Sequence, residues 1–141
     1  MNKEEMIAVD ACPETVTIFI SQRMNGKTDA AISTYRYCVM ECLSKKFDGC
    51  VSFSLPLEPL AYSPVYMLGE SLKQLDGCNL AVFPEDWNEA RGCAIEHLVC
   101  EKYGIPTITV NKTGDRILTE LTDEDVIKKL YKKAIESFRK L

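Results

Sequence analysis

The feature that most constrains the fold is the alternation of short apolar runs with longer segments of helical periodicity. The run TVTIFI at 15–20 is rich in β-branched residues, which is typical of a buried strand. From Thr28, apolar residues recur with a helical period as far as Phe47. The same two patterns then repeat along the chain, with strands predicted at 50–54, 80–83 and 105–110 and helices at 64–76 and 91–103. Such alternation predicts βαβ units around a parallel sheet.

Local signals predict where these elements begin and end. Ser63 followed by Pro64 is a typical helix start, with a capping hydroxyl and a first-turn proline. Gly104 is a typical residue to end the helix before it. Residues 114–118 favour a short fifth strand, and a last amphipathic helix is predicted at about 123–140. The segment LPLEPLAYSP between the second strand and its following helix holds three prolines, which disfavour regular structure.

We therefore expect a single α/β domain over residues 1–141, with a core at about 15–110. The predicted fold is flavodoxin-like (Rossmann-like), with a parallel sheet of four or five strands in the order 2-1-3-4-5 and helices on both faces. Ligands of such sheets bind beyond the carboxyl ends of the strands, where the strand order switches. This rule directs attention to the loops at 21–28, 54–63 and 84–92.

Composition excludes several classes of function. The chain of 141 residues has 46% hydrophobic and 27% charged residues and a net charge of −4, which argues against a binder of nucleic acid or of anionic membranes. No apolar run approaches the length of a membrane span. The N-terminal stretch is acidic and contains Pro13, unlike a signal peptide. A cytoplasmic protein is expected.

The seven cysteines, at positions 12, 38, 42, 50, 78, 93 and 100, invite a disulfide or metal interpretation. Their number is odd, no C-x-x-C spacing occurs, and His97 is the single histidine. Zinc sites usually need four ligands in paired spacings. Reduced thiols that behave as small apolar residues, with no bound metal, are therefore predicted.

The stretch TIFISQRMNGKTDA reads as strand, turn and helix start, the order in which phosphate-binding loops are built. A triphosphate loop that ended in Gly26-Lys27-Thr28 would need glycine at position 21, where this chain has Ser21. A nucleoside triphosphatase is therefore disfavoured. Two interpretations stay open for this loop: a site for a phosphate or for sugar hydroxyls, or a tight turn without a ligand.

A second group of candidate residues lies in WNEARGCAIEH, at 87–97. Gly92 is small enough for a ligand to approach the start of the helix, and Glu96 follows about one turn later. An ionised carboxylate placed there is suited to attack an anomeric carbon. Trp87 offers a ring that could cover a base. The plainer interpretations are a surface glutamate, a tryptophan that packs in the core, and a structural His97.

Three stretches, ISQRMNGKT, YMLGESLKQLDGCNLAVFPEDW and ARGCAIEHLVCEKYGIP, resemble a family of small bacterial and phage proteins. That family is similar to the nucleoside 2-deoxyribosyltransferase superfamily, which includes nucleotide N-glycosidases. The resemblance implies a glutamate nucleophile in a G-x-x-x-E setting, which Gly92 and Glu96 match. It also implies that the first loop, with Ser21, Met24 and Gly26, contacts the sugar or a 5′-phosphate.

The chain departs from that pattern at two places. Arg23 stands where the family usually has proline, and it adds a cation that could meet a phosphate. Glu70-Ser71 stands where many of the transferases have an aspartate that holds the sugar, so Ser71 becomes the candidate for that contact.

The sequence thus predicts an N-glycosidase or (deoxy)ribosyltransferase that acts on a nucleoside or nucleoside monophosphate. Glu96 is the predicted nucleophile at C1′, with Asp86 as an acid for the leaving base or Trp87 stacked against it. No metal or cofactor is required. The alternative is a non-catalytic nucleotide-binding or sensor protein on the same scaffold. The resemblance also implies a homodimer or a higher homo-oligomer.

Overall fold

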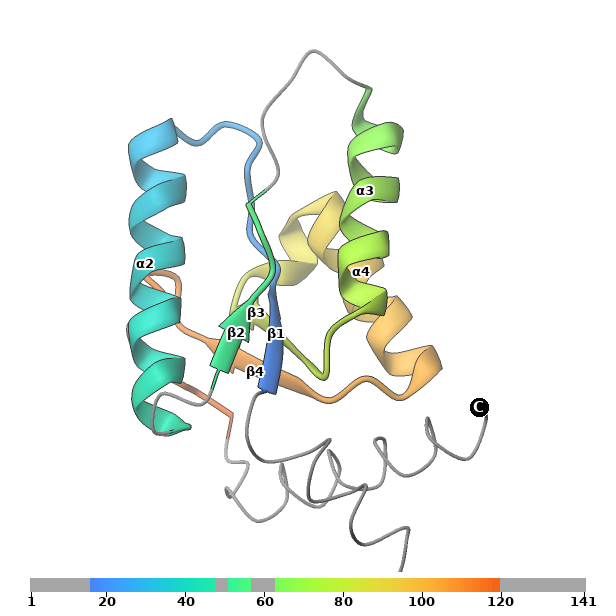
Figure 1. Cartoon of the computed structure of the whole chain (residues 1–141). Helices are drawn as coiled ribbons and strands as arrows, with labels where there is room; N and C mark the ends of the chain where they lie inside the picture. The colour runs from blue at the N-terminus through green and yellow to red at the C-terminus, as the bar shows by residue number, and fades with distance from the viewer. Residues whose placement is uncertain (1–15, 48–50, 57–62, 120–141) are drawn as a thin grey trace, which may run out of the picture.

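The computed structural model describes residues 16–47, 51–56 and 63–119, and these residues build an α/β fold around one parallel sheet. Its four strands lie in the order β2-β1-β3-β4 (Figure 1). Their bounds are β1 Val16–Ile20, β2 Val51–Phe53, β3 Leu80–Pro84 and β4 Thr107–Val110. All three neighbouring pairs are parallel. The predicted α/β class, the parallel pairing and the order of the first four strands are confirmed.

The helices begin and end where the local signals predict. Their bounds are α2 Asp29–Lys46, α3 Pro64–Asp76, the 3-10 turn η1 Trp87–Glu89 and α4 Arg91–Tyr103. The hydroxyl of Thr28 accepts a hydrogen bond from the amide of Ala31, and Ser63 caps α3 in the same way. Gly104 ends α4 with a left-handed φ of 71°, a conformation that glycine adopts without strain.

The core lies on both faces of the sheet because the strands are covered from both sides. Figure 1 shows α2 on one side of the strands, with α3 and α4 on the other. Along β1, Ile18 and Ile20 pack toward Val39 and Leu43 of α2. Phe19, between them, packs in a second cluster with Leu75 and Cys100. This alternation is the period of two that a β-strand imposes on its side chains.

The central strand β3 is buried along its whole length, as expected for a strand with helices over both faces. It pairs with β1 on one side and with β4 on the other. The switch in strand order therefore falls between β1 and β3. The loops that follow these two strands carry most of the candidate site residues.

The fifth strand expected at 114–118 does not form as a parallel strand. The chain instead turns after β4 and returns, making one antiparallel bridge between Val110 and Ile117. The turn is closed by hydrogen bonds, among them Asn111 N to the carbonyl of Arg116 at 3.0 Å. The predicted C-terminal helix at about 123–140 lies outside the described residues.

Among the helices that the structure describes, none combines the length and the apolar character needed to cross a membrane.

Candidate active site

The centre of the candidate site is the carboxylate of Glu96, which is only 6% exposed. The hydroxyl of Ser21 donates a hydrogen bond to its Oε1 at 2.8 Å. The hydroxyl of Ser71 donates one to its Oε2. Each oxygen thus has its own donor, and the two donors come from parts of the chain 75 and 25 residues away. Paired donors of this kind favour the ionised form of a carboxylate.

The three side chains meet because of how their elements pack. Ser21 directly follows β1, and its amide extends the sheet by donating to the carbonyl of Val82 at 2.9 Å. Ser71 and Leu75 are the buried residues of α3, four positions apart on one helix face. Cys93, Glu96 and Cys100 are the buried residues of α4. Ser71 and Glu96 therefore lie among the buried residues of their helices, together with residues of the core.

Two opposing effects act on the acidity of Glu96. Burial raises the pKa of this carboxyl above its ordinary value, and the hydrogen bonds from Ser71 and Ser21 oppose that rise. No ion pair between Glu96 and a cation occurs among the described residues. Within this part of the chain, two neutral hydroxyl donors hold the Glu96 carboxyl, and it takes part in no ion pair.

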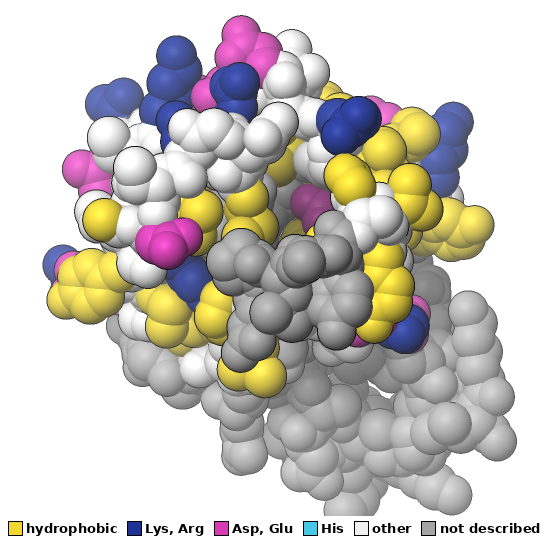
Figure 2. Space-filling view, turned by 90° about the horizontal axis from the view of Figure 1, so that it is seen from above, with side chains coloured by type: hydrophobic (Ala, Val, Ile, Leu, Met, Phe, Trp, Pro, Cys, Tyr) yellow, Lys and Arg dark blue, Asp and Glu magenta, His cyan; other side chains and the backbone are white. Residues whose placement is uncertain are grey.

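Glu96 and Ser71 line a cavity of about 730 Å³ at the carboxyl edge of the sheet. One wall is apolar and comes mainly from the first turns of α3, with Val65, Met67 and Leu68. Figure 2 looks onto this edge and shows a hollow flanked by hydrophobic side chains, with an acidic side chain recessed in it. The size and the mixed lining suit a small organic molecule with a few polar groups.

Gly92, Arg23 and Met24, which the sequence predicts to bind substrate, are part of the lining of the same cavity. A Cβ built on Gly92 would have no neighbour within 4 Å, so this position leaves open space beside Glu96. Gly26 lies further out, at an exposed turn with a φ of 77°. It allows the tight turn of this loop, in which the amide of Lys27 donates a hydrogen bond to the carbonyl of Met24.

Asp86 does not lie beside Glu96. It lines a neighbouring cavity, where the guanidinium of Arg23 lies 3.8 Å from its carboxylate. The same Arg23 nitrogen lies 3.8 Å from Glu89, which lines the Glu96 cavity. Arg23 therefore stands between the two cavities, with one acidic neighbour on each side.

Trp87 packs against protein side chains. Its ring stacks on His97 with centroids 3.7 Å apart and an interplanar angle of 6°, and both rings meet Phe83 edge-on. Burial lowers the pKa of His97, which favours its neutral form in this stack. Trp87 is absent from the described lining of the Glu96 cavity.

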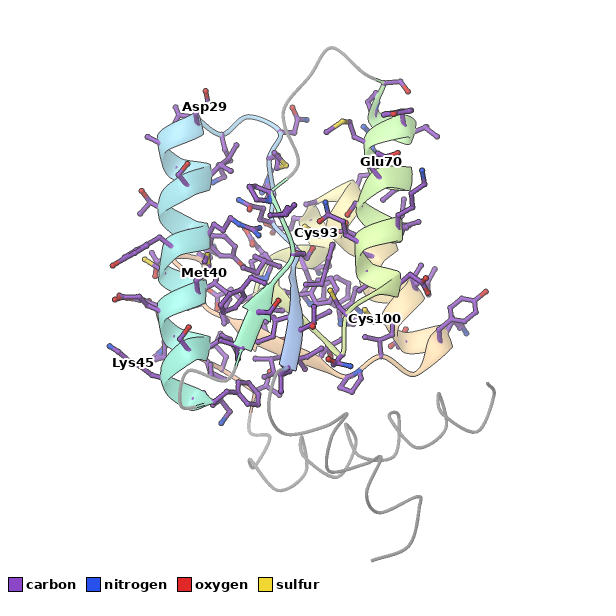
Figure 3. The ribbon with its side chains drawn as sticks, viewed as in Figure 1. Asp29, Met40, Lys45, Glu70, Cys93 and Cys100 are labelled. Atoms are coloured by element: carbon purple, nitrogen blue, oxygen red, sulfur yellow. The ribbon has the colours of Figure 1, made fainter. Side chains whose placement is uncertain are left out.

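Cys93 and Glu70 lie in different environments. The thiol of Cys93 lines the cavity, and Figure 3 shows it among the interior side chains between the strands and α3. Burial raises its pKa to about 11, so it remains a protonated thiol. Glu70 forms an ion pair with Lys73 at 3.1 Å, and Ser71 is the residue of the pair that faces inward.

The described part of the chain holds no group of three or more His, Cys, Asp or Glu residues placed to bind a metal ion.

In comparisons with known proteins, no family model, no curated protein and no solved structure matches this chain.

Proposed function

We propose that the protein cleaves or exchanges the N-glycosidic bond of a nucleoside or nucleoside monophosphate, with Glu96 as the nucleophile. The observation that carries the proposal is the Glu96 carboxylate itself. It is buried at the switch in strand order, held by two serine hydroxyls, and part of the lining of a cavity of nucleoside size. A buried carboxylate that forms no ion pair among the described residues is costly to keep ionised, and such an arrangement is typical of a functional site.

In the proposed reaction, an oxygen of Glu96 forms a bond to C1′ of the sugar while the bond from C1′ to the base nitrogen breaks. The electron pair leaves with the base, which takes up a proton. Water, or a second base, then attacks C1′ and releases the carboxylate. The Ser21 and Ser71 hydroxyls orient the carboxylate for the attack. Asp86 lines the neighbouring cavity, so we assign a bond-making role to Glu96 alone.

The decisive experiment incubates the full chain with a panel of nucleosides and nucleoside monophosphates and measures free base by chromatography. Glu96→Gln keeps the size and hydrogen bonding of the side chain but removes its charge, so base release is expected to fall at least about a thousandfold. Glu101→Gln is the matched control, because Glu101 is an exposed carboxylate on the same helix. A 2-fluoro sugar analogue is expected to leave a covalent adduct on Glu96, which peptide mass analysis would locate.

The same panel separates the enzyme from the alternative function. If wild type and Glu96→Gln bind one nucleotide equally well and neither releases base, the protein is a nucleotide sensor. Full activity in Glu96→Gln would refute the nucleophile assignment and direct the search to Asp86 or Glu70.

A further inference from the structure

A second cavity, of about 430 Å³, lies at the same edge of the sheet, and the proposed reaction does not use it. Three strands lead to it: Gln22 and Lys27 follow β1, Pro84 ends β3, and Lys112 follows β4. Gln22 and Arg23 line both cavities. The second cavity is therefore a neighbour of the Glu96 cavity, with its own walls from α2 and from the turn after β4.

The charge in this cavity is opposite to that of the chain. Arg23, Lys27 and Lys112 contribute three cations, and Asp86 contributes one carboxylate. The whole chain has 17 basic and 21 acidic residues. Within the described residues neither Lys27 nor Lys112 forms an ion pair, so no described carboxylate neutralises these two ammonium groups.

The rest of the lining is apolar or neutral. Ala31, Ile32 and Cys38 come from α2, and Pro84 comes from the end of β3. Tyr35 also lines the cavity, and its hydroxyl donates to the carbonyl of Ser21 at 3.4 Å. An occupant thus meets cations at one part of the wall and apolar carbon at another. This combination fits an anion that carries an organic group better than it fits an inorganic ion.

We propose that this second cavity binds a small organic phosphate, with Lys27, Lys112 and Arg23 around the phosphate group. Phosphate is favoured over a carboxylate because its double negative charge matches the two lysine ammonium groups, and lysine is a common phosphate ligand. The organic part lies against Ile32 and Pro84. The inference goes beyond the proposed function and does not depend on Glu96.

Isothermal titration calorimetry of the full chain with phenyl phosphate, inorganic phosphate and phenol tests the site. Phenyl phosphate is expected to bind about tenfold more tightly than inorganic phosphate, because its ring covers the apolar wall. Phenol, which lacks the charge, is expected not to saturate. The Lys27→Gln/Lys112→Gln double variant is expected to weaken phenyl phosphate at least tenfold.

The matched control is Lys45→Gln, since Lys45 lies at the other end of α2 from Asp29 (Figure 3) and is exposed. It is expected to leave the affinity unchanged. Glu96→Gln is also expected to leave it unchanged, which separates this site from the catalytic proposal. Equal affinity in wild type and the double lysine variant would refute the site. Loss of phenyl phosphate binding in Glu96→Gln would also refute it, by placing the anion in the Glu96 cavity.

Discussion

At the scale of the residue, Glu96 is costly to keep ionised. Burial raises its folded pKa above the value in the unfolded chain. The folded protein therefore holds this proton to higher pH than the unfolded one, and the free energy of unfolding falls as pH rises between the two pKa values. Above that range the cost is constant, and below it the cost is absent. If Glu96 is the proposed nucleophile, this penalty is the kind of stability cost that enzymes commonly carry at an active site.

Glu96→Gln is accordingly expected to raise the melting temperature at pH 7.5 by a few degrees, because glutamine has no charge to desolvate. Each unit by which the pKa is raised corresponds to about 1.4 kcal/mol. The gain is expected to disappear near pH 4, where the wild-type side chain is protonated too. Calorimetric scans at both pH values, with Glu101→Gln as the control, measure this difference. A variant less stable than wild type by the same amount at both pH values would contradict the argument.

Ser71→Ala tests the hydrogen bonds that hold the carboxylate. Without the Ser71 hydroxyl, one of the two hydrogen bonds that oppose the effect of burial is lost, so the pKa of Glu96 is expected to rise further. Carboxyl-carbon NMR titration of Glu96 measures this directly, and the acidic limb of the rate profile is expected to move in the same direction. Ser71→Thr keeps the hydroxyl and is expected to restore the pKa. The exposed Ser33→Ala serves as the unrelated serine control. An unchanged titration in Ser71→Ala would show that the serine does not act on Glu96.

At the scale of the element, the sequence predicts where helices begin and end, because these points depend on contacts within one or two turns. Ser63 and Gly104 act within one helical turn, and both perform the predicted capping role; Thr28 caps α2 in the same local way. The convergence of Ser21 and Ser71 on one carboxylate depends on how α3 packs beside α4, which no local pattern encodes. The two serines were candidates from the resemblance, whereas their shared partner is a property of the tertiary structure.

Tertiary contacts also decide two features that local sequence signals leave open: the partner of Trp87 and the direction of the chain after β4. A tryptophan near a candidate site suggests a stacking surface for a base, but its actual partner is His97, ten residues later in the chain. Residues 114–118 have enough apolar character for a strand, yet their direction is set by the turn at Asn111–Asp115. That turn is fixed by its own hydrogen bonds, including Asn111 to Asp115 at 2.6 Å.

Gly114 gives a test of this turn. Its φ is 82°, and an added Cβ would lie 2.8 Å from Cγ2 of Val39 and 2.9 Å from the carbonyl oxygen of Tyr35. Gly114→Ala therefore combines backbone strain with a clash against α2, and a loss of about 2–4 kcal/mol is expected. Gly104→Ala is the matched control, since it has a φ of 71° but no neighbour within 4 Å, and about 1 kcal/mol is expected. Urea denaturation measures both, and equal losses would show that α2 does not confine Gly114.

At the scale of the whole molecule, both cavities lie at one edge because all four strands are parallel and end there. The loop after β1 contributes to both, through Gln22 and Arg23. Any ligand that displaces Arg23 from Asp86 on one side changes its position relative to Glu89 on the other. The two cavities are thus adjacent by topology, and Arg23 belongs to the lining of both.

The predicted homo-oligomer also belongs to this scale. Val65 and Tyr66 of α3 and Leu98 of α4 are at least half exposed, and Val65 lies at the wall of the Glu96 cavity with Ile95. Such an exposed apolar group beside a site is typical of a surface that another protein covers. We expect a dimer that uses this face, and Leu98→Lys is expected to shift sedimentation velocity profiles from dimer to monomer at micromolar concentration.

The matched control for this prediction is Tyr37→Lys, because Tyr37 is 61% exposed on α2, across the sheet from α3 and α4. It introduces the same charge on an apolar side chain without touching the proposed interface, so the dimer is expected to persist. Circular dichroism of both variants establishes that the fold is retained. A wild-type chain that sediments as a monomer would contradict the prediction, and dissociation by Tyr37→Lys but not by Leu98→Lys would move the interface to α2.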